Sequence, residues 1–349
     1  MLQDKIRSTP HKASLSVKPY LLKLVPKMKQ LLSLLLWLCF FQVYAQQKQL
    51  LTHDPSTIVK EGTTYRYFAT GMGIMSVASE DLIHWKVEKP IFELGKHPAW
   101  IDSTVKGFKG HFWAPDCIWM NGRYYVYYSC STFGSAVSAI GVASSPTLNP
   151  NASNYQWTDL ALVVKSSDKK DFNAIDPSLL KDSDGKVYMT YGSFHGGIGG
   201  VEIDTLTGKI KSGASIQKLA GGRESDWEAS CLIKEGEFYY LFVNNGLCCK
   251  GLNSTYYIVV GRSKNPLGPF IDQTGRDLTA GGGTVLLRTE GKYIGPGHVS
   301  LLRENGKNYT SIHYYDATDE GKPKFGILQM KFKKGWPSLI KDKLTEEIK

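Results

Sequence analysis

The sequence predicts an all-β fold, a five-bladed β-propeller, and two recurring patterns support this prediction. In the first pattern, a short apolar run leads to a turn that ends at a glycine. A strand rich in Tyr, Phe and β-branched residues then follows. Repeats of roughly 50–70 residues built from short strands are typical of propeller blades. The pattern occurs five times, with its turns ending at Gly62, Gly122, Gly185, Gly236 and Gly306.

The second pattern supplies a further strand in each repeat. A divergent outer strand would complete four-stranded blades, all within one domain over residues 46–349. A β-sandwich with similar strands is the alternative, but it does not explain why both patterns recur five times in one order. The segments are GIMSVASEDLIHW from 73, SAIGVASSPTL from 138, YIVVGRSKNPLGPF from 257, GILQMKFKKGW from 326 and a weaker IGGVEIDTLTG from 198.

Residues 1–45 are predicted to be an N-terminal extension that ends in a secretory signal peptide. Residues 31–45 are apolar, follow two lysines and end in a motif suited to cleavage before Gln46. A membrane anchor is the alternative, but fifteen residues are short for a span of about 20. Met28 is an alternative start. We therefore expect export to a periplasm or to the medium, with no membrane span in the mature chain.

Charge and cysteine content narrow the classes of function. The formal net charge is +10, of which residues 1–45 contribute +6, and no basic run remains. This distribution argues against nucleic-acid binding. The five later cysteines lack metal-ligand spacing. We expect Cys117 and Cys231 to be buried as small apolar residues. Adjacent Cys248 and Cys249 leave two alternatives open, a vicinal disulfide or free thiols.

Each repeat begins with a candidate site residue. In equivalent blades these residues would converge on one axis, although more than 200 positions separate the first from the last. A carboxylate at the start of a buried strand is costly unless it faces water or a partner. Several such acids therefore predict one shared polar pocket. The residues are Asp54, Asp116, Asp176, Glu228 and His298, which lie 8, 6, 9, 8 and 8 positions before their glycines.

Acids gathered in this way suit the hydrolysis of glycosidic bonds. Close carboxylates move each other's pKa values apart, so that one can act as general acid and another as general base. Trp113 and Phe133 offer flat faces for stacking on sugars, with blade core as the alternative. Asn173 and Ser193 could hydrogen-bond hydroxyl groups.

Two histidines accompany the acids. His298 heads the fifth repeat and is expected to be a ligand, with a purely structural histidine as the alternative. His53 precedes Asp54, and because side chains alternate along a strand we expect it to point away from the site.

The motifs identify the chain as similar to glycoside hydrolase family 43, and within it to the endo-1,5-α-L-arabinanases. The resemblance extends from Thr52 to Trp336. It implies a five-bladed propeller that cleaves internal α-1,5-L-arabinofuranosidic bonds of arabinan with inversion and uses no organic cofactor. The motifs, in family order, are HDPS, FWAPD, STFGSAVSAIG, NAIDPS, YGSF, EAS, CCKGLNSTY and GHVSLL.

The resemblance also implies a role for each site residue. Asp54 matches the general base, Glu228 the general acid, and Asp176 the carboxylate that tunes the acid's pKa and orients substrate. His298 matches the residue beside a central ion, usually calcium, that is held largely through water. His195 departs from the family, which often has tryptophan there. The matched substrate-binding residues are Trp113, Phe133, Gly134, Asn173, Ala174, Ile175, Ser193 and Phe194.

Two alternatives to an endo-arabinanase remain. The first is a relative with the same acids and another specificity: an exo-arabinanase, an α-L-arabinofuranosidase or a β-xylosidase. The second is a non-catalytic sugar-binding propeller, which predicts the loss of at least one acid, whereas Asp54, Asp176 and Glu228 are all present. We expect a monomer whose partner is the polysaccharide substrate.

Overall fold

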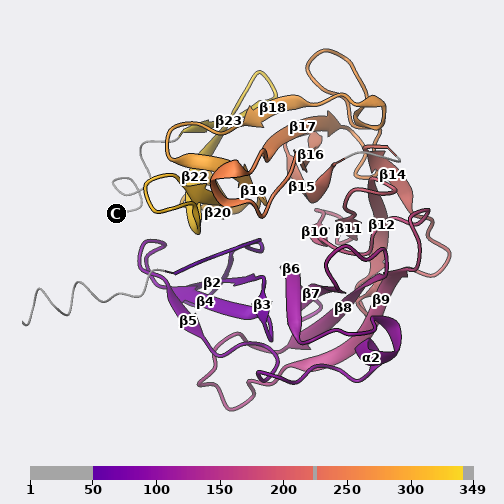
Figure 1. The fold of residues 1–349 in the computed structure, drawn as a ribbon, viewed down its shortest axis with the longest axis vertical. Coiled ribbons are helices and arrows are strands. Elements are labelled where there is room, and N and C mark those ends of the chain that lie inside the picture. The colour runs from indigo at the N-terminus through magenta and orange to yellow at the C-terminus, as the bar shows by residue number, and fades with distance from the viewer. Residues whose placement is uncertain (1–49, 223–225, 341–349) are drawn as a thin grey trace, which may run out of the picture. The chain divides into compact units, whose positions relative to one another are not determined.

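The computed structural model describes residues 50–222 and 226–340. Within the unit Leu50–Lys349, the strands form five antiparallel sheets arranged around one axis (Figure 1). The predicted five-bladed β-propeller is therefore confirmed. The predicted signal peptide and the alternative start at Met28 lie outside the described residues.

The first two blades are joined by a strand that leaves one sheet for the next. The strand β3 (Gly71–Met72) begins two residues after β2 (Thr64–Ala69) of blade 1. It pairs with β6 (His111–Met120) of blade 2, with Gly71 opposite Phe112. Blade 1 has the order β1 (Val59–Glu61), β2 (Thr64–Ala69), β4 (Met75–Ser79), β5 (Lys86–Glu88). Blade 2 has the order β3 (Gly71–Met72), β6 (His111–Met120), β7 (Arg123–Ser131), β8 (Ser138–Ser145), β9 (Thr158–Ser166).

The other three blades follow in chain order. Blade 3 contains β10 (Ser178–Lys181), β11 (Val187–Tyr191), β12 (Ile198–Asp204), β13 (Lys209–Ile210) and β14 (Gln217–Ala220). Blade 4 contains β15 (Glu228–Glu235), β16 (Phe238–Asn245), β17 (Tyr257–Ser263) and β18 (Thr284–Leu287). Blade 5 contains β19 (Tyr293–Gly297), β20 (Leu302–Glu304), β21 (Lys307–Asp316), β22 (Lys322–Lys333) and β23 (Trp336–Ile340). The short helices are α2 (Trp100–Thr104), η2 (Gly251–Asn253) and η3 (Leu278–Ala280).

The repeated glycines set the register of the inner hairpins. In blade 2, Met120 pairs with Arg123 across the two-residue turn Asn121–Gly122, whose φ angles are 48° and 73°. This is the geometry of a type I′ turn, for which Asn-Gly is strongly preferred. Asn305–Gly306 makes the same kind of turn between β20 and β21.

Five apolar clusters hold the blades together, one between each pair of neighbours. The last cluster packs Ile58 and Tyr67 of the first repeat against Leu302 and Ile327 of the fifth, and so closes the ring. Cys117 belongs to the core, as does Cys231, so the predicted burial of both is confirmed. Among the described residues, no helix has the length and apolar character needed to cross a bilayer.

Candidate active site

One residue at the head of each blade has a left-handed backbone. Positive φ is uncommon outside glycine, and such residues often cluster at functional sites. It recurs once per blade and coincides with the predicted head at Asp54, Asp176 and His298. In blades 2 and 4 the prediction is displaced, because Ala114 takes this position in blade 2 and Ala229, the residue after Glu228, takes it in blade 4. The residues are Asp54 (φ 51°), Ala114 (36°), Asp176 (58°), Ala229 (51°) and His298 (59°).

The backbone N–H of each head residue is anchored by a side chain of the preceding blade. The acceptors near the ends of the second strands are Thr70 for Ala114, Ser129 for Asp176, Asn244 for His298 and His313 for Asp54. Ala229 instead donates to Asp176 Oδ2 at 3.0 Å. Each head is therefore fixed by the preceding blade, and the arrangement of the heads depends on all five blades being in place.

Asp116 does not head its blade, contrary to the sequence prediction. Ala114 occupies that position, and Asp116 lies two residues further along β6, beyond a register shift. Its buried carboxylate accepts the N–H groups of Thr57 at 2.9 Å and Leu179 at 2.7 Å. Asp116 therefore connects the inner segments of three blades, which is a structural role.

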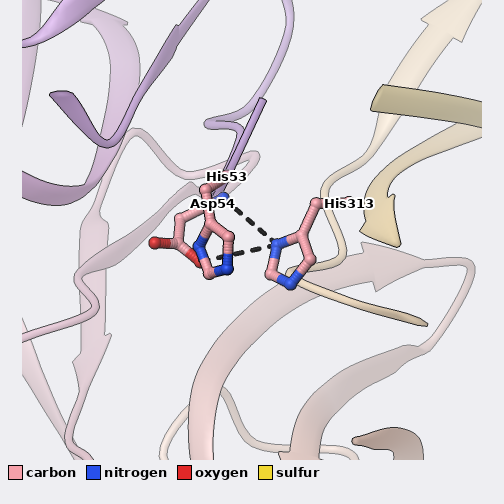
Figure 2. A group of neighbouring side chains, drawn as sticks. All are labelled: His53, Asp54 and His313. Carbon is pink, nitrogen blue, oxygen red and sulfur yellow. Dashed lines mark hydrogen bonds and ion pairs between the residues drawn. The ribbon is translucent and has the colours of Figure 1, made fainter. Parts of the chain in front are cut away.

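Asp54 is held from both sides of its carboxylate, and Figure 2 shows two of its neighbours, His53 and His313. Oδ2 accepts a hydrogen bond from Thr70 Oγ1 at 2.6 Å, while His53 Nδ1 lies 2.8 Å and His298 Nδ1 3.2 Å from Oδ1. Burial disfavours the charged form, but His53 and His298 hold the pKa of Asp54 well below its ordinary value. This carboxylate is suited to remain ionised.

The pKa values of Glu228 and Asp176 are raised, in contrast to that of Asp54. Glu228 is buried and accepts hydrogen bonds from Ser193 Oγ and Tyr256 OH, both at 2.7 Å. Burial raises the pKa of Glu228, and these two bonds only partly offset it. Burial and the nearby Glu228 charge likewise raise the pKa of Asp176. One proton is therefore readily retained between these two acids.

His298 reaches the same cluster, as predicted from its place in the fifth repeat. Burial opposes its protonation, but the charges of Asp54, Asp176 and Glu228 raise its pKa to about 9. His298 Nδ1 is buried without a hydrogen-bond partner, although Asp54 Oδ1 is 3.2 Å away. Calcium prefers six to eight oxygen ligands. When His298 is neutral, its Nδ1 beside one carboxylate oxygen would suit an ion whose other ligands are mainly water, and such an ion would take the place of the proton.

A second set of possible metal ligands, His53, Asp54 and His313, is better explained by internal bonding. His313 Nδ1 accepts the N–H of Asp54 at 3.1 Å, which occupies its lone pair. His53 faces Asp54 with one nitrogen and contacts Tyr315 OH at 2.6 Å with the other. The expectation that His53 points away from the site is therefore wrong. The left-handed backbone at Asp54 breaks the alternation on which it relied.

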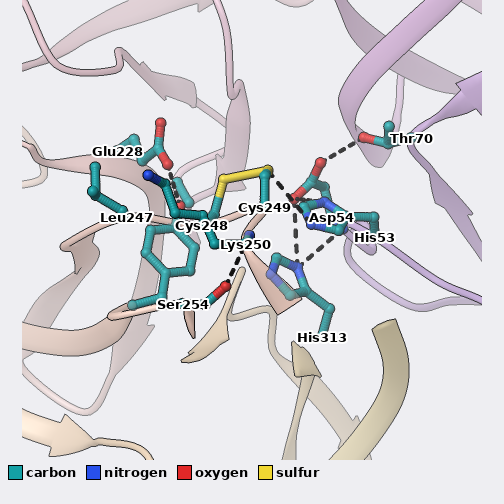
Figure 3. The surroundings of a disulfide bond; sticks show 12 residues. His53, Asp54, Thr70, Glu228, Leu247, Cys248, Cys249, Lys250, Ser254 and His313 are labelled. Atoms are coloured by element: carbon teal, nitrogen blue, oxygen red, sulfur yellow. Dashed lines mark hydrogen bonds and ion pairs between the residues drawn. A yellow bond between two sulfur atoms is a disulfide. The ribbon is translucent and has the colours of Figure 1, made fainter. Parts of the chain in front are cut away.

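Cys248 and Cys249 form a vicinal disulfide beside the acids, which decides between the two alternatives left open by the sequence. Figure 3 shows the disulfide with Asp54, His53 and Glu228 around it. The backbone N–H of Cys249 donates to Tyr315 OH at 2.7 Å, and its Sγ lies 3.8 Å from His53 Nε2.

The aromatic residues predicted to bind sugar lie side by side. The rings of Trp113 and Phe133 are 6.0 Å apart at 70°, and Phe133 is 89% exposed. Gly134 follows in the same loop with φ 78°. Because the exposed Phe133 ring contributes little to the core, its exposure favours contact with a ligand over the alternative of blade core.

The other predicted substrate residues surround the acids. Ser193 binds Glu228, and neighbouring Phe194 is 37% exposed. Asn173, Ala174 and Ile175, which directly precede Asp176, are buried. Ser138 Oγ donates to Asn173 Oδ1 at 2.6 Å and accepts the N–H of Ala174 at 2.9 Å.

Sequence reasoning missed the residues that hold the acids in place. Thr70, His313, Tyr315 and Tyr256 all contact Asp54, His53 or Glu228. A signal for some of them exists, since a polar residue recurs near the end of the second strand in every repeat. Those endings read FAT, YYS, YMT, FVN and SIH.

Comparisons with known proteins agree with this geometry. The model of glycosyl hydrolases family 43 matches residues 48–337. An extracellular exo-α-(1→5)-L-arabinofuranosidase of Cellvibrio japonicus is 38% identical over 86% of this chain and 90% of that protein. An extracellular endo-α-(1→5)-L-arabinanase of Bacillus subtilis is also 38% identical, over 82% and 87%.

Solved structures give the same result. An α-L-arabinanase of Cellvibrio cellulosa complexed with arabinohexaose superposes with a TM-score of 0.80 at 36% identity, covering 84% of this chain and 96% of that one. An exo-1,5-α-L-arabinanase from a bovine ruminal metagenomic library has a TM-score of 0.79 at 39% identity, covering 85% and 99%.

Proposed function

The chain belongs to glycosyl hydrolase family 43, and from that premise we propose that it is an exported arabinanase. Its substrate would be arabinan, and it would cut internal α-1,5-L-arabinofuranosidic bonds with inversion. The observation that carries the proposal is that the pKa values of two interacting carboxylates are shifted in opposite directions. The pKa of Asp54 is lowered and that of Glu228 is raised. Such a pair suits base and acid roles. The pKa of Asp176 is raised too, and the match of the EAS motif to the family's general acid supports Glu228 in that role.

In this proposal Asp54 takes a proton from the attacking water, and Glu228 gives its proton to the departing sugar oxygen. The bond from water to the anomeric carbon forms as the glycosidic bond breaks on the opposite face, which inverts the configuration. Asp176 stabilises the protonated form of Glu228 and anchors Ala229. Trp113 and Phe133 would stack on the arabinose rings.

An ion beside His298 is part of the proposal, with His298 and Asp54 as its protein neighbours and water as its other ligands. When bound, it would supply positive charge near the three carboxylates. His298 itself, buried and adjacent to Asp54, already offers a positive charge there when protonated.

Export is proposed from the apolar segment 31–45 and from the names of two relatives, both described as extracellular. Residues 46–349 would then form the mature enzyme.

An exo-acting enzyme is the second candidate, because relatives with exo activity in their names are as similar as those with endo activity. The test is the product profile over time on linear, debranched 1,5-α-arabinan. A rapid fall in viscosity with a ladder of oligosaccharides would support endo cleavage. Steady release of arabinose or one short oligomer from long polymer would instead favour the exo candidate. Absence of any product would reject arabinan as the substrate.

A further inference from the structure

We propose that His53, held by Tyr315 and through it by the backbone of Cys249, is a positioning residue for Asp54. The inference rests on the proposed function, in which Asp54 is the general base. Three contacts carry it: Cys249 N–H to Tyr315 OH at 2.7 Å, Tyr315 OH to His53 Nε2 at 2.6 Å, and His53 Nδ1 to Asp54 Oδ1 at 2.8 Å. Figure 3 shows the disulfide, His53 and Asp54 together.

The direction of this relay follows from the donors. Because the Tyr315 oxygen accepts the N–H of Cys249, its own hydrogen is free to point at His53 Nε2. A neutral His53 must then carry its hydrogen on Nδ1, which faces Asp54. A protonated His53 carries a hydrogen on both nitrogens. In either charge state, therefore, His53 donates to Asp54 Oδ1.

The other oxygen of Asp54 is controlled in the same manner. Thr70 Oγ1 accepts the N–H of Ala114 at 2.9 Å, so its hydroxyl hydrogen is directed to Asp54 Oδ2 at 2.6 Å. Each carboxylate oxygen thus receives a hydrogen whose direction is fixed by a backbone N–H elsewhere. A base that must face an attacking water gains from such orientation, since small displacements of a catalytic group are costly.

The packing of His53 supports a fixed ring. It stacks on the buried His313 at a centroid distance of 4.2 Å, and its second nitrogen is occupied by Tyr315. The His53 ring is therefore held on its face by His313 and at its edge by Tyr315. Neither contact would be needed if His53 were a solvated neighbour of the base.

The test uses substitutions that keep or remove single bonds. Asparagine places its amide nitrogen near the position of His Nδ1, so His53→Asn can keep the donor to Asp54 and loses the contact with Tyr315. His53→Ala loses both. We expect kcat on linear arabinan to fall on the order of 10²-fold for His53→Ala and by about tenfold or less for His53→Asn, with KM nearly unchanged.

A double-variant comparison isolates the relay. Tyr315→Phe alone should lower kcat, by about three- to tenfold, and should have no further effect when added to His53→Asn, where the link is already broken. Tyr314→Phe is the matched control, because Tyr314 lies on the opposite face of β21 and packs against Tyr293 at 4.6 Å. It should keep the wild-type kcat.

Three results would overturn the proposal. Equal losses for His53→Ala and His53→Asn would reduce His53 to a packing role. Additive effects of Tyr315→Phe and His53→Asn would show that they do not act in one chain. A wild-type kcat in His53→Ala would show that His53 does not position Asp54. Asp54→Asn in the same assay separates failure of the proposed function from failure of the relay. If Asp54→Asn stays active, Asp54 is not the base. If Asp54→Asn is inactive while the His53 and Tyr315 variants keep the wild-type kcat, only the relay is rejected.

Discussion

The backbone N–H of Ala229 donates to Oδ2 of Asp176 at 3.0 Å, so the residue that follows Glu228 is anchored on a second buried acid. The heads of blades 3 and 4 are thereby joined through a carboxylate. Burial raises the pKa of both acids, and the charge of Glu228 raises that of Asp176 further. Two such groups titrate as a pair, with the second proton lost at higher pH than from either acid alone.

Replacing Asp176 by asparagine should therefore shift the alkaline limb of the pH profile of kcat/KM. The amide keeps an acceptor for Ala229 and carries no charge. Without a neighbouring anion, Glu228 loses its proton at lower pH, so the limb should move to lower pH by about one unit or more. Profiles from pH 4 to 9 would measure this. A limb that stays in place, or moves to higher pH, would contradict the pairing.

Glu228→Gln should discriminate between leaving groups. On arabinan the departing sugar needs a proton, and we expect kcat to fall by about 10²–10⁴-fold. An aryl arabinofuranoside with an acidic phenol leaves as an anion and should lose far less. Glu235→Gln, at the far end of the same strand, where Glu235 pairs with Arg303 at 3.0 Å, is the control. Equal losses on both substrates would argue against Glu228 as the acid.

The propeller was predictable because the pattern of apolar residues that become buried recurs in each repeat of the sequence. Each blade needs apolar inner strands and a tight turn, and both are visible as composition and glycine spacing. Asp54, Asp176 and Glu228 were predictable for the same reason, since an acid opening a buried strand stands out. The structure brings all three into one cluster, together with His298.

The misassigned residues share a different cause. A register shift in β6 places Asp116 two residues from the head, and a positive φ at Asp54 turns His53 toward the site. A bulge leaves no clear composition signal, and a left-handed residue other than glycine leaves only a preference for Asn, Asp and His. Tyr315 of blade 5 contacts His53 of blade 1 and Cys249 of blade 4, and Tyr256 reaches Glu228 from the segment just before β17, so spacing within the repeat pattern does not reveal either contact.

Asp116→Ala should weaken the fold without touching the chemistry. The change leaves the N–H groups of Thr57 and Leu179 without their acceptor. Each unpaired buried group costs about 1–3 kcal/mol, so we expect a clear fall in the midpoint of thermal unfolding. Asp184→Ala, in an exposed turn, is the control. The kcat of the folded fraction should stay near wild type, whereas a large loss of kcat with normal stability would make Asp116 a site residue.

Removal of metal ions tests the site beside His298. Thorough chelation should lower activity or thermal stability, and added calcium should restore it. His298→Ala should show the lowered activity from the start and respond little to chelator, because its orphaned Nδ1 is gone. Chelated enzyme with full activity and stability would make the ion dispensable, and the imidazole alone would then account for the positive charge in the pocket.

Phe133→Ala should affect binding and leave stability unchanged. The ring is 89% exposed and its aromatic neighbour is Trp113, so its removal opens no cavity in the core. Loss of one stacking face is worth about 1 kcal/mol, and we expect KM for arabinan to rise about five- to tenfold with kcat nearly constant. Trp119→Ala is the matched control, because Trp119 is 45% exposed at the far end of β6, beside the Asn121–Gly122 turn. If both variants bind arabinan equally well, Phe133 does not line the substrate path. If only Phe133→Ala weakens binding, the path runs over the blade heads, where the three acids lie.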